Sequence, residues 1–222
     1  MSRFTISAAP QRSIAWHQAR VGRLTGTSAK AMLAGATTDT RRGLIDRLLA
    51  ERITGVPQDS FQGNEATEWG VAHEDEARIA YEWHAGAVVQ ECGFLALADL
   101  MAGASVDGYI GDFAGIVELK APFKTERHLA ARRRIPPDYL PQVRHNLWVS
   151  GAAYCDYVSF DPRCDGPWRL FVHRVTRAQA DVAGYEQKAL AFLADVETEI
   201  AAHHTTTNIS GTLAAVLIEA AS

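Results

Sequence analysis

Two carboxylates and a lysine lie close together in the stretch SVDGYIGDFAGIVELKAPF, which spans residues 105–123. Asp107 precedes a turn that contains glycines, and Glu118 and Lys120 follow that turn in an otherwise apolar segment. Alternate side chains of a strand share a face, so Glu118 and Lys120 point the same way. If the strands pair through the turn, Asp107 lies beside Glu118. Two carboxylates at that range repel unless one is protonated or a cation lies between them.

Metal-assisted hydrolysis is the chemistry that such a set can perform. A hard divalent cation such as Mg²⁺ takes oxygen ligands and often keeps several waters. Lys120 beside such a cation could stabilise charge on a phosphate or hold an attacking water. The spacing alone is loose, because a strand with charged residues at an exposed edge has the same pattern. The neighbouring segments decide between the two interpretations.

The segments on either side of this stretch add polar groups on expected helices. WGVAHEDEARIAYEW carries three consecutive acids within a helix expected from about Thr67 to His84, and spacing does not fix the face of Glu74. YLPQVRHNLWVSG places Tyr139, Gln142 and Asn146 at i, i+3 and i+7. Gln142 is thus either a polar contact to the site or a boundary residue. For the acidic run the alternative is a solvent-facing surface.

Two basic features could bind phosphate. KTERHLAARRR, residues 124–134, has five Lys and Arg residues against one acid, and Lys124 and Arg127 stand nearest the catalytic segment. Such contacts give affinity for DNA without reading its sequence. Arg20 precedes a helix that is expected to begin near Thr27, and a helix N-terminus attracts anions. The alternatives are a solvated basic loop and an unpartnered surface cation.

A mixed sheet flanked by helices is the fold class that the order of elements predicts, which makes the chain an α/β protein. The apolar spacing predicts helices first, then strands, one helix, two strands and terminal helices. Thr27 is expected to cap a helix that ends at Gly35, and residues 205–211 form a weak tail before a short helix over 212–222. The remaining helices are expected over 13–22, 39–55, 67–84, 137–151 and 181–203, and the strands over 87–97, 104–110, 115–123, 155–160 and 168–175.

Bulk composition narrows the class of protein. The chain has 222 residues, which fits one globular domain. Its net charge of −4 does not by itself indicate a nucleic-acid partner. The three cysteines form no CxxC pair, which argues against a zinc or iron–sulfur site, and their odd, sparse count fits a reducing cytoplasm. No apolar run suits a signal peptide or a membrane span. The histidines, including His73, His145 and the pair 203–204, are interpreted as surface or structural residues, and Trp69 and Trp148 as core anchors.

Four segments in register resemble the lambda exonuclease family, the YqaJ-like viral recombinases among the PD-(D/E)XK nucleases. The resemblance covers about Ala15 to Arg163, most of the chain. It implies a restriction-endonuclease-like core in one nuclease domain over residues 1–222, with N-terminal helices over about 13–85, a catalytic sheet and helix over about 87–176 and C-terminal helices over about 178–222. The segments are WHQARVGRLTGTSAKAML, WGVAHEDEARIAYEW, SVDGYI…VELKAPF and LPQVRHNLWVSGAAYCDYVSFDPR.

The resemblance also implies an activity: Mg²⁺-dependent digestion of one strand of linear duplex DNA from 5′ to 3′, for recombination by single-strand annealing. Two Mg²⁺ ions are expected, with Mn²⁺ as a substitute. The implied partners are duplex DNA ends, two further copies in a homotrimer and a single-strand annealing protein, with no membrane, in the cytoplasm of a bacterial host. A structure-specific or restriction-like endonuclease of the same fold and a non-catalytic DNA-end-binding module are the alternatives.

Site residues follow from the resemblance position by position. It implies catalytic roles for Asp107, Glu118, Lys120, Glu74 and Gln142. The implied metal ligands are Asp107, Glu118, Glu74 and the backbone carbonyl of Leu119. Substrate contacts are expected from Arg20 at the 5′-phosphate with Thr27 or Ser28, and from Lys124, Arg127 and Arg144.

Three departures from the family pattern stand out. Arg144 occupies the place of a second glutamine, the turn before Glu118 is one residue longer, and Asp99 is only the nearest candidate for a further aspartate.

The pKa of Lys120 would have to fall far below its usual value near 10.4 for the amine to act as a base. We therefore expect Lys120 to act by position and charge.

Overall fold

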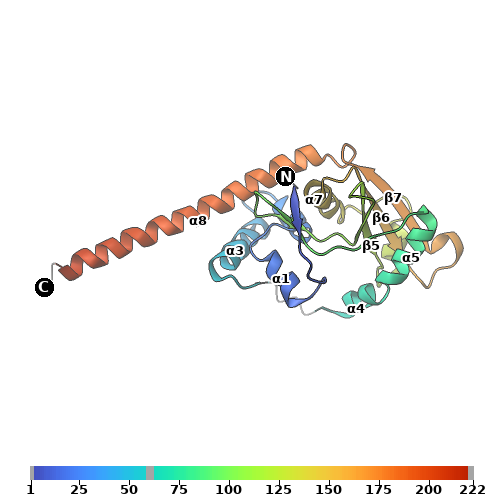
Figure 1. The fold of residues 1–222 in the computed structure, drawn as a ribbon, viewed down its shortest axis with the longest axis horizontal. Helices are drawn as coiled ribbons and strands as arrows, with labels where there is room; N and C mark the ends of the chain where they lie inside the picture. Colours follow the sequence, from blue (N-terminus) through green and yellow to red (C-terminus); the bar gives the residue numbers. More distant parts are fainter. Residues whose placement is uncertain (1–2, 59–62, 220–222) are drawn as a thin grey trace.

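The central feature of the fold is a four-stranded mixed sheet (Figure 1). The structure is a computed structural model that describes residues 3–58 and 63–219, with side chains described up to residue 202. The strand order is β4-β5-β6-β7, in which β5 and β6 are parallel and the outer pairs are antiparallel. The strands are β4 (Gly108–Ile110), β5 (Gly115–Lys120), β6 (Tyr154–Phe160) and β7 (Leu170–Thr176).

Helices cover both faces of this sheet, so the predicted mixed sheet flanked by helices is confirmed. Helix α5 (Glu74–Ala85) contacts β5, β6 and β7, while α7 (Leu140–Ser150) contacts β5 and β6. The pleat of β5 sends alternate side chains to opposite faces of the sheet. Val117 and Leu119 point to the face covered by α5, where they pack with Tyr81 in one buried cluster. Glu118 and Lys120 therefore project to the other face, as the sequence predicts.

A second, smaller sheet joins the N-terminus to the middle of the chain. Its order is β1-β2-β3 with antiparallel pairing throughout. The segment that the sequence predicts as one strand over 87–97 forms a strand only at its end. The segment over 104–110 divides between the two sheets, so Asp107 lies at the crossing between them rather than at the end of a strand. The strands are β1 (Phe4–Ile6), β2 (Leu95–Leu97) and β3 (Gly103–Ala104).

Short helices form the N-terminal part, and two of them have clear side-chain caps. Ser13 accepts a hydrogen bond from the Trp16 amide, and Thr38 accepts one from the Arg41 amide. Thr27 does not cap a helix as predicted, since it lies inside a 3₁₀ turn and its hydroxyl contacts Thr25. The elements are α1 (Ile14–Arg20), η1 (Gly26–Ser28), α2 (Ala29–Met32) and α3 (Asp39–Thr54).

The single helix predicted over 67–84 is two helices. Helix α4 (Glu65–Ala72) ends at His73, whose backbone is no longer helical, and α5 begins at Glu74. The run of acids that follows His73 falls in the first turn of α5, where carboxylates favour a helix N-terminus. These acids favour a helix start at this point, and the break makes Glu74 the first residue of a helix.

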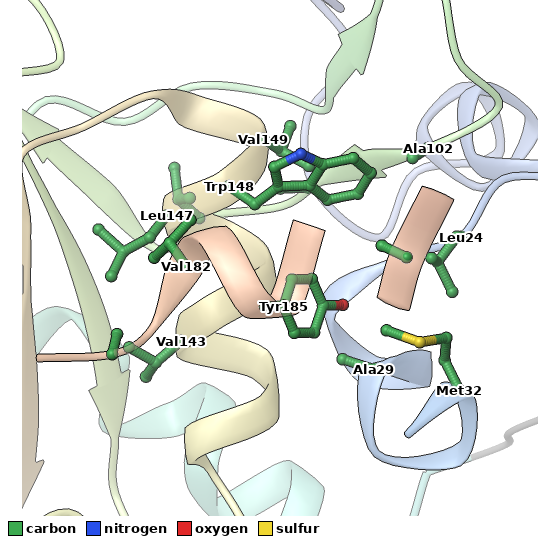
Figure 2. Close-up of a cluster of buried hydrophobic side chains, with 14 of the residues drawn as sticks. Leu24, Ala29, Met32, Ala102, Val143, Leu147, Trp148, Val149, Val182 and Tyr185 are labelled. Atoms are coloured by element: carbon green, nitrogen blue, oxygen red, sulfur yellow. The ribbon is translucent and has the colours of Figure 1, made fainter. Parts of the chain in front are cut away.

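The remaining helices include a long one at the C-terminus. Helix α8 (Val182–Glu219) is one helix where the sequence predicts two with a weak segment between them, and Figure 1 shows it extending beyond the body of the molecule. Its first turns contribute to the main core, where Val182 and Tyr185 lie around Trp148 and Val143 of α7 (Figure 2). The predicted basic loop after β5 contains α6 (Thr125–Ala130), and η2 (Gly166–Trp168) precedes β7.

Candidate active site

The predicted acidic pair and lysine converge at one end of β5. The register that pairs Gly108 with Val117 brings Asp107 alongside Glu118. One oxygen of Asp107, Oδ2, accepts a hydrogen bond of 2.7 Å from the Leu119 amide, and it lies 3.8 Å from Nζ of Lys120. The Lys120 ammonium also donates to Oε1 of Glu118. The three residues therefore form one charged cluster.

Burial sets the protonation of this cluster. Glu118 has no solvent-exposed surface, and the Asp107 side chain is 17% exposed. Burial, followed by the charge of Glu118, raises the pKa of Asp107 to about 7. Burial by itself lowers the pKa of Lys120, but the charges of Glu118 and Asp107 outweigh it and raise that pKa above its usual value. Lys120 is therefore a permanent cation here, which favours a positioning and electrostatic role over that of a base.

Helix α7 and its N-cap residue supply two site residues that the sequence interpretation did not select. Nδ2 of Asn146 donates a hydrogen bond of 2.9 Å to Oε2 of Glu118. The Lys120 ammonium lies 5.7 Å from the centre of the Tyr139 ring. Both residues share the helix face of Gln142, so their spacing contained the signal. Gly26 permits this approach, because a Cβ there would stand 2.7 Å from Oδ1 of Asn146.

The cluster opens into a cavity of about 520 Å³. Glu74 lies at its wall, at the start of α5, and forms an ion pair of 2.7 Å with Arg12. Arg12 is a third residue that the sequence interpretation missed, since it stands in an irregular segment with no periodic pattern. Other lining residues include Asp107, Leu119, Lys120, Arg127 and Tyr139.

These residues fit a hard divalent cation. The donor set consists of carboxylate oxygens, which Mg²⁺ prefers, and a cation would offset both the burial and the charge of Glu118 that raise the pKa of Asp107. As the side chains stand, no three His, Cys, Asp or Glu residues among those described are gathered closely enough to hold a metal ion. The contacts give the reason: Lys120 bonds to Glu118, and Arg12 holds Glu74.

A second cavity, of about 730 Å³, lies beside the first. Arg20 lines it and donates from Nη1 to the Ser105 hydroxyl at 2.9 Å, while its guanidinium stacks 4.1 Å from the centre of the Trp16 ring. The hydroxyls of Thr27 and Ser28 also line it. The structure thus brings together the three residues predicted for a 5′-phosphate. Arg47, which sequence reasoning missed, donates to the Ser28 hydroxyl at 2.6 Å.

Other predicted residues lie away from the charged cluster. Arg144 donates to the carbonyl of Ala180 at 2.7 Å, which ties α7 to the segment before α8. Gln142 packs over Gly26, and neither it nor Arg144 is among the described residues that line the cavity beside Asp107 and Lys120. Lys124 is exposed at the start of α6. Asp99 is exposed in a third cavity near α8, so the structure gives it no place beside Asp107.

The histidines and tryptophans divide by burial. His145 is fully buried: Nε2 donates to the carbonyl of Gly103 and Nδ1 accepts from the Tyr185 hydroxyl, which fixes the neutral ring. The structural interpretation of His145 and the core position of Trp148 are therefore confirmed. Trp69 is only half-buried and packs under the Arg163 guanidinium at 4.4 Å, which corrects its assignment to the core. The side chains of residues 203–204 lie outside those described.

Comparison with known proteins gives one family and several structural neighbours. The model of the YqaJ-like viral recombinase domain matches residues 15–153. The crystal structure of an alkaline exonuclease from Laribacter hongkongensis superposes with a TM-score of 0.77 and 29% identity, over 88% of this chain and 98% of that chain. The same exonuclease in complex with dAMP gives a TM-score of 0.78.

A more distant neighbour supports the fold alone. The crystal structure of a phage-related exonuclease from Haemophilus somnus 129PT has a TM-score of 0.61 and 12% identity, over 82% of this chain and 96% of that chain. No curated protein matches the chain. No described helix is long and apolar enough to cross a membrane.

Proposed function

Because the chain belongs to the YqaJ-like viral recombinase domain family, we propose that it is a metal-dependent exonuclease that degrades one strand of linear duplex DNA from 5′ to 3′. The family and the PD-(D/E)XK-like α/β fold predicted from the sequence are confirmed, and the neighbours indicate a phage-type exonuclease.

The observation that carries the proposal is the cluster of Asp107, Glu118 and Lys120, of which Asp107 and Lys120 line the cavity. Three charges of this kind are costly to gather in a buried place unless a ligand makes use of them. Asp107 and Glu118 would hold the metal, with Glu74 and the carbonyl of Leu119 as further ligands. A divalent ion bound there, Mg²⁺ or Mn²⁺, supplies an activated water and charge stabilisation for the leaving oxygen.

The chain's own groups then have distinct tasks. The Leu119 amide holds Asp107, and Asn146 holds Glu118, so both carboxylates are fixed before substrate binds. The Lys120 ammonium, kept charged by these carboxylates, orients the reacting phosphate and stabilises the negative charge that develops on it. Gln142 remains a proposed contact on the same helix.

The DNA path follows local positive charge rather than the net charge of −4. Arg127 lines the catalytic cavity, and Lys124 lies at the start of the same short helix. Arg20, Thr27 and Ser28 would receive the 5′-terminal phosphate in the adjacent cavity. The relative solved with dAMP supports a deoxynucleoside monophosphate as product. Arg144 is tied through Nε to the Ala180 carbonyl, and its terminal amino groups would make the proposed DNA contact.

The biological setting is proposed from the family. We infer one nuclease domain over the chain, assembled as a homotrimer, that works with a single-strand annealing protein in the cytoplasm of a bacterial host. The long projection of α8 does not enter this proposal.

Digestion of 5′-phosphorylated linear duplex with and without Mg²⁺ tests the activity. Glu118→Ala and Lys120→Ala should abolish nucleotide release while DNA binding largely survives, and circular dichroism should show both variants folded. Release that persists in both folded variants would overturn the assignment. Cleavage of closed-circular DNA would identify an endonuclease, and binding to DNA ends without Mg²⁺-dependent release would identify an end-binding module.

A further inference from the structure

The two cavities of the site meet at Arg12. Arg12, Thr27 and Thr67 each line both the catalytic cavity and the cavity around Arg20. A DNA strand whose end lies in one cavity and whose reacting phosphate lies in the other has to pass this junction. Arg12 is the cation among the three.

The backbone around Arg12 is built to place it there. Arg12 has φ of 67°, a left-handed conformation that non-glycine residues adopt at a cost of about 1 kcal/mol or more. The neighbouring residues hold this turn: Gln11 donates from its side chain to the Val106 carbonyl at 3.0 Å, and Ser13 caps α1. Because Val106 precedes Asp107, the turn is fastened directly to the catalytic segment.

The partner of Arg12 in the DNA-free protein is Glu74. Their ion pair of 2.7 Å leaves the Arg12 side chain 53% exposed and the Glu74 side chain 31% exposed. A half-exposed pair contributes little to stability, so stability alone does not explain a strained arginine at this place. A guanidinium with free donor directions is well suited to a phosphate, which it can bind with two parallel hydrogen bonds.

We propose that Arg12 is a phosphate-binding residue at the junction of the two cavities, which neutralises Glu74 in the absence of DNA and exchanges Glu74 for a DNA phosphate on binding. The exchange frees the Glu74 carboxylate to serve as a metal ligand. This inference rests on the proposed function. It couples substrate binding to completion of the ligand set, so that the chain holds its metal best when DNA is in place.

Two equilibrium measurements that need no turnover test the exchange. The first is the affinity for a 5′-phosphorylated duplex in EDTA, by fluorescence anisotropy over a range of salt concentrations. The second is the affinity of the DNA-free protein for Mn²⁺, by electron paramagnetic resonance. Arg12→Gln should weaken DNA binding about tenfold and lower the salt slope by about one, because one phosphate contact is lost. The same variant should tighten Mn²⁺ binding several-fold, because Glu74 is released.

Arg12→Gln should change the DNA affinity and the Mn²⁺ affinity in opposite directions. This pattern distinguishes an exchange of partners from a merely structural role of Arg12. Glu74→Gln should give the reverse pattern, with weaker Mn²⁺ binding and tighter DNA binding. Arg42→Gln removes an exposed arginine of α3 that pairs with Asp39, and it should change neither affinity. Changes of the same sign in Arg12→Gln, or no change, overturn the inference while Mg²⁺-dependent digestion by the wild type stands. A wild type that binds neither Mn²⁺ nor DNA overturns the proposed function and this inference together.

Discussion

The side-chain amide of Asn146 donates a hydrogen bond of 2.9 Å to Glu118, and both residues are buried. The bond joins the middle of α7 to the middle of β5, so it links the helix on one face of the sheet directly to the charged cluster. The other oxygen of Glu118 accepts from Lys120. Glu118 is thus held through both of its carboxylate oxygens, which fixes the orientation of the carboxylate within the cluster.

Asn146→Ala should therefore lower the rate of nucleotide release by about tenfold to a hundredfold, the usual cost of losing a residue that orients a metal ligand. Stability should fall by about 1–3 kcal/mol, because the Glu118 oxygen loses its buried donor. Asn146→Asp should be worse in both assays, since it places a second carboxylate against Glu118. Rates with Mg²⁺ and urea unfolding measure the two effects, and an Asn146→Ala enzyme with full activity would contradict the orienting role.

Gly26→Ala should also lower the rate of nucleotide release, because it disturbs Asn146 from the side of the helix that faces Gly26. A Cβ at residue 26 would stand 2.7 Å from Oδ1 of Asn146 and 3.2 Å from Cγ of Gln142, so the Asn146 amide has to move away from Glu118. Gly43→Ala is the matched control, because a Cβ there meets no atom within 4 Å and lies on a helix. The control should gain about 0.5–1 kcal/mol. Unfolding and nucleotide release of both variants compare them, and equal behaviour would refute the close approach.

Asp107→Asn should stabilise the metal-free protein at alkaline pH. The pKa of Asp107 is raised to about 7, whereas an unfolded Asp titrates near 3.9, so the native state binds more protons between these values. The contribution of Asp107 to the free energy of unfolding is fully present below about pH 4. It is lost as pH rises through 7, and the loss is at most about 4 kcal/mol. Thermal unfolding in EDTA at pH 5 and pH 8.5 measures it. The asparagine variant should gain over the wild type mainly at pH 8.5, and a gain equal at both pH values would contradict the raised pKa.

His145 should give the opposite pH dependence. Burial lowers the pKa of His145 to about 4, from an unfolded value near 6.5, so the unfolded chain binds the extra proton between these values. Its stabilising contribution is present above about pH 6.5 and is lost as pH falls through 4, by about 3 kcal/mol. Because Asp107 acts with the opposite sign in part of this window, the difference between wild type and His145→Gln reports the effect. Urea unfolding should show the variant less stable at pH 7.5 and the gap narrowing at pH 4.5.

Much of the fold could be predicted because the core elements carry periodic signals. The alternation in β5 separates Val117 and Leu119 from Glu118, whereas α7 is buried at Val143 and at every position over 145–150. The two errors have different sources, one in a local signal that was overlooked and one in tertiary pairing. The division of the long helix at His73 follows from the acids after it, and the crossing at Asp107 follows from pairing with two different sheets.

The site residues that lie on regular strands and helices could be predicted from the sequence better than those on irregular backbone. The strand pleat alone puts Glu118 beside Lys120, and a hairpin pairing adds Asp107. The helical spacing placed Asn146 on the same face as Gln142, but the sequence does not predict that its side-chain amide reaches Glu118. Arg12 could not be found this way, because its place depends on a left-handed turn and on the contact of Gln11 with Val106.

Arg20→Ala should reduce the preference for 5′-phosphorylated over 5′-hydroxyl ends by about tenfold, since the guanidinium would supply charge-assisted hydrogen bonds to the terminal phosphate. Ser105 and Trp16 hold the guanidinium within its cavity, so the binding direction is fixed before DNA arrives. Arg20→Lys keeps the charge but loses the planar fork, and it should retain only part of the preference. Initial rates on paired substrates that differ only in the terminal phosphate measure the effect, with Arg42→Ala as the control. Equal wild-type rates on the two substrates would refute the assignment, because a phosphate pocket that does not discriminate between these ends is not used in the reaction.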